Sequence, residues 1–85
     1  MACDAILILH HLRLGLFKLT SHAKQRMDER GVTPSDIQCC AKTVKLVKKQ
    51  DCEKHLIIGF DCDNDVLRAV AVWDSEAVII TVMGD

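Results

Sequence analysis

Residues 66–83, VLRAVAVWDSEAVIITVM, contain two runs rich in apolar and β-branched residues, separated by a short polar segment. Val66–Trp73 and Ala77–Met83 have the composition of strands, and Asp74–Glu76 has that of a hairpin turn. Both runs are almost continuously apolar, which is typical of strands that are covered on both faces. The stretch therefore predicts an antiparallel pair of strands that other elements enclose.

Two further β-rich runs precede this pair in the sequence. Val44–Lys49 and His55–Cys62 are rich in apolar and β-branched residues, and the acidic segment Asp61–Asp65 follows as a second hairpin turn. Sequential strands most often pair with each other, so consecutive antiparallel pairing is the simplest topology. We therefore predict a four-stranded antiparallel meander.

Helical signals fill the region before these strands. Thr20 or Ser21 can cap a helix that ends at Gly31, because glycine suits the left-handed exit of a helix. Thr33 can cap a second helix with Asp36 at the capping-box position. The chain therefore predicts an α+β fold with N-terminal helices packed on the meander. We expect the helix pair on one face of the sheet, and the N-terminal segment or a second subunit on the other.

The first 16 residues read as an apolar N-terminal extension ahead of a single domain at residues 17–85. Plotted as a helix, residues 5–19 place apolar side chains around the whole circumference, which implies burial on most sides. Two histidines and an arginine interrupt this segment, and it is too short to span a bilayer. We expect it to pack in a homodimer interface, with a poorly ordered extension as the alternative.

Composition limits the classes of function. The chain has 85 residues, of which 49% are hydrophobic and 27% charged, so it is typical of one small folded domain. A formal net charge of −1 excludes a broadly basic coat protein, so any nucleic-acid binding must come from a local patch. Five cysteines with no secretory signal indicate reduced thiols and a cytoplasmic location.

One cluster of cations stands out in the helix that ends at Gly31. His22, Arg26 and Arg30 are spaced four residues apart, so they lie within about 80° of each other on one stripe. Cations at this spacing repel each other and cost the helix a few tenths of a kcal/mol per pair. An anion such as a phosphate group would relieve that repulsion, so we interpret the stripe as a candidate anion site.

The order of these elements resembles a known group of proteins. A His-x-x-x-Arg-x-x-x-Arg-Gly helix, a short second helix, four strands and a last strand that ends Ile-Thr-Val are similar to a widespread family of small bacterial proteins. That family resembles the RelE-like toxins of the barnase–EndoU–colicin–RelE group of metal-independent ribonucleases. The likeness covers roughly residues 17–84 and matches His22, Arg26, Arg30, Gly31 and Thr81. It implies a ribonuclease-type site between helix and sheet, with RNA as substrate and a cognate antitoxin as a candidate partner.

The chemistry of metal-free RNA cleavage assigns a role to each candidate. Such cleavage needs a base, an acid and cations that stabilise the pentacovalent phosphorus. His22 suits the base, because the first turn of a helix disfavours a charged imidazole. Arg26 and Arg30 carry fork-shaped donors for phosphate oxygens, and the Thr81 hydroxyl could hydrogen-bond the phosphate. The sequence shows no second residue for proton transfer.

Further basic residues could contact the RNA backbone. Arg68 lies on a predicted strand, and Lys45 and Lys49 belong to a lysine-rich run along the first strand. Each also has a purely structural interpretation, which we favour: an ion-paired or solvated strand residue for Arg68, and an edge-protecting charge for each lysine.

Two alternatives to catalysis stay open for the stripe. His22 could only cap or pack the helix, and Arg26 could pair with Glu29, which would leave no functional site. The chain could also be a non-catalytic binding module that uses the same basic groove for an anionic or acidic partner. The cysteines, including Cys52, fit no standard zinc spacing, and the Asp61–Asp65 turn lacks the glycine and glutamate of a calcium loop. We therefore expect no metal and no cofactor.

Overall fold

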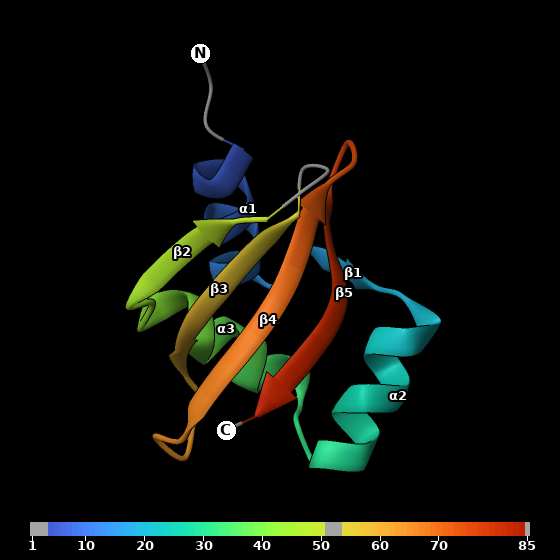
Figure 1. Cartoon of the computed structure of the whole chain (residues 1–85), viewed down its shortest axis with the longest axis vertical. Helices are drawn as coiled ribbons and strands as arrows, with labels where there is room; N and C mark the ends of the chain where they lie inside the picture. Colours follow the sequence, from blue (N-terminus) through green and yellow to red (C-terminus); the bar gives the residue numbers. More distant parts are fainter. Residues whose placement is uncertain (1–3, 51–53, 85) are drawn as a thin grey trace.

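The structure is a computed structural model that describes residues 4–50 and 54–84 (Figure 1). Residues 1–3 of the expected extension, together with Cys52, lie outside the described residues. Within them the elements are α1 (Asp4–Leu14), β1 (Phe17–Leu19), α2 (Ser21–Arg30), α3 (Pro34–Lys42), β2 (Leu46–Lys49), β3 (His55–Phe60), β4 (Val66–Trp73) and β5 (Ala77–Gly84).

The five strands form one mixed sheet in the order β1-β5-β4-β3-β2. Strands β2 to β5 pair antiparallel in sequence order, as predicted. The prediction of a purely antiparallel four-stranded sheet is wrong, because a fifth strand, β1, pairs in parallel with β5. Phe17 lies opposite Ala77, and Leu19 lies opposite Ile79. A three-residue strand inside a long apolar stretch has no turn signals of its own, and its partner lies about 60 residues away. The α+β class is therefore confirmed, with one more strand than expected.

The ends of α2 and α3 are fixed by the capping residues that the sequence predicted. The Thr20 side chain accepts a hydrogen bond from the Ala23 backbone N–H at 3.0 Å, and Gly31 ends the helix with φ of 68°. In α3, Thr33 and Asp36 form a complete capping box. Both helices therefore begin where local hydrogen bonding dictates.

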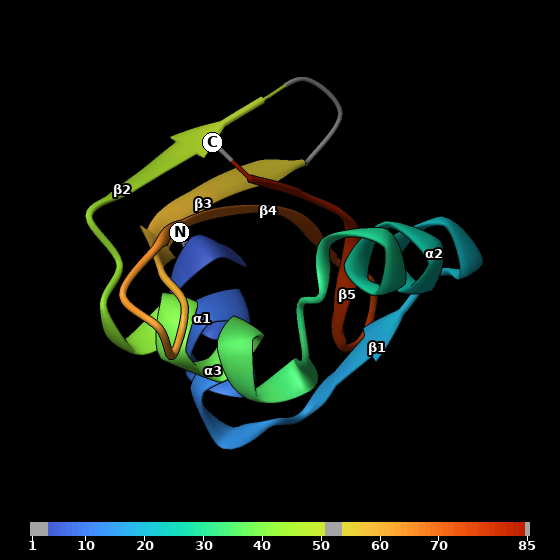
Figure 2. The same cartoon turned by 90° about the horizontal axis from the view of Figure 1, so that it is seen from below.

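The three helices divide between two sides of the sheet. Helices α1 and α3 pack together and cover one face of β3, β4 and β5, which we call the inner face. Helix α2 packs on β5 and β1, and Figure 2 shows it beyond β5 from α1 and α3. The expected pairing of α2 with α3 on one face is therefore wrong. Helix α1 takes that place, because its buried residues Ile8 and Leu12 join the core at the inner face.

Helix α1 belongs to the same hydrophobic core as the rest of the chain. Ile8 and Leu12 are 0% and 1% exposed and lie in one cluster with core residues of α3 and the sheet. Ile6 and Leu14 of α1, and Leu16 just after the helix, are exposed. These three side chains are the surface on which the expected dimer contact would form.

The other face of the sheet, which we call the outer face, is open over β3 and β4 (Figure 1). Side chains alternate along β3, so that Ile57 and Gly59 are buried while Leu56, Ile58 and Phe60 are half-buried. The expectation that the last two strands are enclosed on both faces is therefore not met for β4, whereas β5 is contacted by both α1 and α2. None of the described helices has the length and apolar character to cross a membrane.

Candidate functional site

Helix α2 has a buried side, through which it packs on the sheet, and an exposed stripe of basic residues. Ala23 and Met27 are 0% and 3% exposed, and they are the residues through which the helix joins the core. His22, Arg26 and Arg30 are all exposed. Eight residues of helix separate the first cation from the last, which is about 12 Å along the axis. The structure thus brings the three predicted residues together as a row on the surface.

Little in the described chain neutralises this row. The Arg26 guanidinium lies 3.9 Å from the Glu29 carboxylate, an exposed i,i+3 pair of the kind that contributes little to stability. No hydrogen bond or ion pair involves the side chain of His22 or Arg30 within residues 4–50 and 54–84. The imidazole of His22 and the guanidinium of Arg30 are therefore available to an external ligand.

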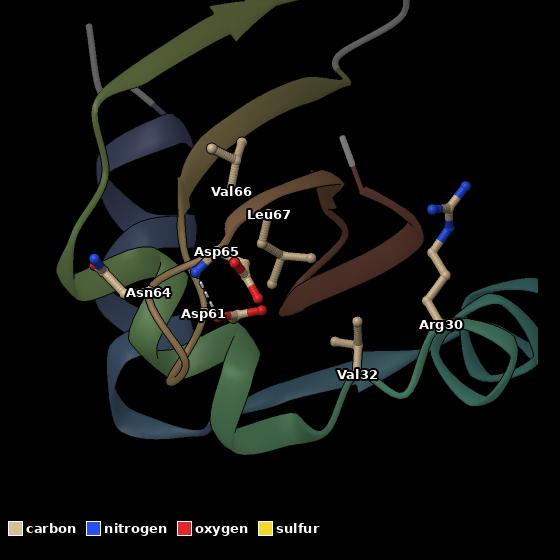
Figure 3. Close-up of a pocket in the computed structure, with 7 residues that line it drawn as sticks. All are labelled: Arg30, Val32, Asp61, Asn64, Asp65, Val66 and Leu67. Carbon is tan, nitrogen blue, oxygen red and sulfur yellow. Dashed lines mark hydrogen bonds between the residues drawn. The ribbon is translucent and has the colours of Figure 1, made fainter.

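Arg30 stands at the rim of a pocket of about 480 Å³ (Figure 3). The other lining residues are Val32, Asp61, Asn64, Asp65, Val66 and Leu67. Figure 3 shows the Arg30 guanidinium pointing along the edge of the sheet, away from the carboxylates of Asp61 and Asp65. The pocket therefore has one cationic wall and one acidic wall, joined by apolar side chains.

The acidic wall is a tight turn between β3 and β4. One Asp61 oxygen accepts the backbone N–H groups of Asp63 and Asp65, both at 2.9 Å, and Asn64 adopts φ of 67°. This pattern is typical of an aspartate that builds a turn. Within the described residues no three His, Cys, Asp or Glu side chains are grouped to hold a metal ion.

A β-bulge in β5 positions α2 against the sheet. Val70 lies opposite Thr81 and Ala71 opposite Ile79, so Ile80 is the extra residue. The Thr20 hydroxyl, which caps α2, donates to the Ile80 carbonyl at 3.0 Å, and the Thr20 N–H donates to the Ile79 carbonyl at 3.1 Å. The start of the cationic stripe is thereby tied to the strand segment that carries Thr81.

Thr81 and Arg68 lie near each other on the outer face. Arg68 is opposite Met83 and Thr81 is opposite Val70, so the two residues sit on diagonal positions of neighbouring strands. Both are half-buried, and Arg68 already takes part in an interaction within the protein. The structure therefore places these two candidates together, with Thr81 on β5, against which α2 packs, and Arg68 on the next strand of the sheet.

The two lysine candidates lie at the opposite edge of the sheet. Lys49 is the last residue of β2, and Lys45 is the residue just before that strand. The Nζ atom of Lys45 lies 5.7 Å from the centre of the Phe60 ring. Strands β3 and β4 separate β2 from β5, which is about 14 Å across the sheet. Lys45 and Lys49 are therefore not part of the α2 site.

The acidic wall beside Arg30 was not predicted from the sequence. The sequence predicted a turn at Asp61–Asp65 and excluded it as a calcium loop, with no sign of its proximity to Arg30. The distance between this turn and the end of α2 depends on how α2 packs beyond β5, and no local pattern encodes that arrangement. The sequence predicted Thr20 as a capping residue, but it did not predict the hydrogen bond that the Thr20 hydroxyl donates to the Ile80 carbonyl at the bulge.

Comparison with known proteins gives one match. The family described as a domain of unknown function (DUF4258) matches residues 19–84, from the end of β1 to the end of β5. No curated protein and no solved structure matches the chain.

Proposed function

The chain belongs to the DUF4258 family of domains of unknown function, and we propose that it is a metal-independent ribonuclease of RelE-like toxin type. The proposed site is the stripe formed by His22, Arg26 and Arg30, with Thr81 on the neighbouring strand. RNA is the proposed substrate and a cognate antitoxin the proposed partner. Both follow from the resemblance of the sequence to the RelE-like toxins.

The observation that carries the proposal is the lack of internal partners for the stripe. Cations in a row destabilise a helix unless an anion balances them. Arg26 has a single distant carboxylate at 3.9 Å, and the described chain offers none to His22 or Arg30. A phosphodiester backbone along α2 would supply the missing negative charge and match the fork of each guanidinium.

The proposed reaction is the transfer of a phosphoryl group within RNA. His22 takes the proton of the 2′-hydroxyl, and the 2′ oxygen attacks the adjacent phosphorus. The bond to the 5′ oxygen breaks, and that oxygen takes a proton from solvent, which leaves a cyclic phosphate and a 5′-hydroxyl. Arg26 and Arg30 stabilise the charge that develops on the phosphorus oxygens, with the Thr81 hydroxyl as a further donor.

Cleavage of a mixed RNA substrate by purified protein in EDTA tests this function. The parent chain should cleave, and His22→Ala and Arg30→Ala should each lose about a hundredfold or more of the activity, as expected for a general base or a charge-stabilising donor. Lys24→Ala is the matched control, because Lys24 is an exposed cation on the other side of the same helix. It should retain activity close to that of the parent.

Three results would contradict the proposal. Cleavage that disappears with EDTA would indicate a metal-dependent contaminant or mechanism. Equal loss in Lys24→Ala would show that general positive charge, and not the stripe, matters. Absence of cleavage by folded protein, on free RNA and on ribosome-bound RNA alike, would exclude the ribonuclease.

One observation favours a second candidate, a non-catalytic binding module. No described side chain hydrogen-bonds His22, so nothing orients its imidazole or supplies the second proton-transfer group. The same stripe would then bind an anionic or acidic partner without chemistry. RNA binding without cleavage, weakened in Arg30→Ala and retained in Lys24→Ala, would identify this alternative.

A further inference from the structure

Two cysteines from different elements meet beside the acidic turn. Cys39 lies on α3 and is partly exposed, while Cys62 lies on the turn after β3 and is exposed. The Cys62 thiol donates to the Ser35 carbonyl at 3.4 Å, one helical turn before Cys39. Side chains on a helix point back toward its N-terminus, so the Cys39 side chain extends over this same turn. The Cys39 side chain is therefore a neighbour of the Cys62 thiol on the surface of α3.

The backbone around Cys62 is held rigidly in this position. Its N–H donates to the Asp36 carboxylate at 3.0 Å, and Asp36 is itself fixed by the capping box of α3. Cys62 is therefore held next to α3 by a hydrogen bond from its backbone to a buried carboxylate of that helix. Pre-positioned thiols form a disulfide without the loop-ordering cost that separate cysteines would meet.

We propose that Cys39 and Cys62 form a reversible disulfide, which makes this cysteine pair a redox modification site. The oxidant is a low-molecular-weight disulfide such as oxidised glutathione. One cysteine thiolate attacks the oxidant, whose sulfur–sulfur bond breaks and releases one thiol. The second cysteine then attacks the mixed disulfide and releases the second thiol. Two protein thiols are thus oxidised and one small disulfide is reduced to two thiols.

The surroundings of Cys62 affect the reactivity of its thiol. Its contact with the Cys39 thiol, together with desolvation and the nearby Asp36 carboxylate, raises the pKa of Cys62 to about 12. Cys62 is therefore mostly protonated at neutral pH, so exchange should be slow there and faster at alkaline pH. Forming the bridge removes the thiol hydrogen that Cys62 donates to the Ser35 carbonyl. That carbonyl still accepts the helical hydrogen bond from the Cys39 N–H, so it is not left without a donor.

The third described cysteine is excluded from this exchange by burial. Cys40 is 1% exposed, and burial raises the pKa of its thiol to about 11. Its sulfur donates to the Leu67 carbonyl on the inner face, on the other side of the helix from the turn. Adjacent Cys39 and Cys40 thus face different neighbours, although the sequence presents them as a pair.

A bridge between Cys39 and Cys62 would fasten the acidic wall of the pocket to α3. Asp61 and Asn64, which line the pocket opposite Arg30, lie one and two residues from Cys62. Oxidation should therefore reduce the motion of the turn and leave α2 unchanged. Because this inference depends on α3 and the turn alone, it stands whether or not the chain cleaves RNA.

Equilibration of the full chain with reduced and oxidised glutathione, followed by peptide mapping, tests the proposal. We expect one linked peptide that joins Cys39 to Cys62, complete reversal by dithiothreitol, and a rise in Tm of roughly 5–15 °C on oxidation. A Cys3→Ser/Cys52→Ser background removes the remaining thiols. In that background Cys62→Ser should abolish the bridge, whereas Cys40→Ala should retain it.

Other results would overturn the proposal. A bridge between Cys39 and Cys40 would show that the two adjacent cysteines of α3 react with each other, and that Cys39 does not react with Cys62. Glutathione adducts on Cys39 or Cys62 without a bridge, or no oxidation in excess oxidised glutathione, would show that the thiols are not placed for closure. Peptide mapping of the parent chain gives this answer even if a variant fails to fold.

Discussion

Helices α2 and α3 have nearly the same length and the same type of N-cap, yet they serve different purposes. Each begins with a threonine whose side chain accepts a backbone N–H. Helix α3 buries four residues and is tied to the sheet from both ends, whereas α2 buries two and exposes three cations in a row. Burial and fixed hydrogen bonds thus concentrate in α3, and unbalanced charge concentrates in α2.

The attachment of α3 shows how closely it belongs to the sheet. A Cβ on Gly59 would lie 2.3 Å from the Cys40 carbonyl oxygen, so only a glycine in β3 lets the helix approach this far. At the end of the helix the Thr43 hydroxyl accepts the Phe60 N–H at 2.9 Å. Helix α3 is therefore a structural element, whereas the proposed function depends on α2.

The largest difference between the helices should appear when the α3 core is truncated. Ile37 is 0% exposed, so Ile37→Ala removes buried methyl groups and leaves a cavity. We expect a loss of about 2–5 kcal/mol in the free energy of unfolding, measured by urea denaturation. Lys42→Ala, an exposed change on the same helix, should stay within about 0.5 kcal/mol. A loss below about 1 kcal/mol for Ile37→Ala would contradict this role of α3.

A smaller effect with a defined pH dependence should come from Asp36. Hydrogen bonds from the backbone N–H groups of Thr33 and Cys62 hold the pKa of this carboxyl below its usual value, against the opposing effect of burial. Because the folded-state pKa is lowered, the stabilisation is present above about pH 4 and is lost as the pH falls through the lowered value. Asp36→Asn should cost about 1–3 kcal/mol at pH 7.

Denaturation at a series of pH values measures this contribution. The stability of the parent should fall more steeply below pH 4 than that of Asp36→Asn. Asp28→Asn removes an exposed carboxylate from α2 and should keep the steep fall of the parent. Parallel pH profiles for the parent and Asp36→Asn would contradict the assignment.

The smallest effect on stability should come from the cations of α2. His22→Ala, Arg26→Ala and Arg30→Ala should each change the free energy of unfolding by less than about 0.5 kcal/mol. The effect should be small because all three side chains are exposed and, of these, only Arg26 makes an ion pair among the described residues, a weak one with Glu29. A loss above about 1 kcal/mol in thermal or urea denaturation would show that the side chain is structural.

Local features of this fold could be predicted from the sequence, and non-local ones could not. Thr20, Gly31 and the Thr33–Asp36 capping box fixed the helix ends because caps act through residues three or four positions apart. Val66–Trp73 matched β4 residue for residue because its composition and flanking turns are local. The parallel strand β1 escaped prediction because its partner is distant along the chain and its own length is three residues.

The candidate site divides in the same way. Helical spacing predicted that His22, Arg26 and Arg30 share one side of α2, and all three side chains are exposed in the structure. The neighbours of that row depend on tertiary packing. The bulge at Ile80 sets where α2 begins, and the turn at Asp61 forms the opposite wall of the pocket. No periodicity in the sequence links either residue to Arg30.

The most direct test of the division between the helices is RNA binding by matched variants of α2. Fluorescence anisotropy with a labelled single-stranded RNA, at one fixed salt concentration, compares the parent chain with Arg30→Ala and Lys24→Ala. We predict that Arg30→Ala weakens binding at least about tenfold, which is 1.4 kcal/mol, and that Lys24→Ala changes it less than about twofold. Equal weakening by the two variants, or no binding by the parent, would contradict the account.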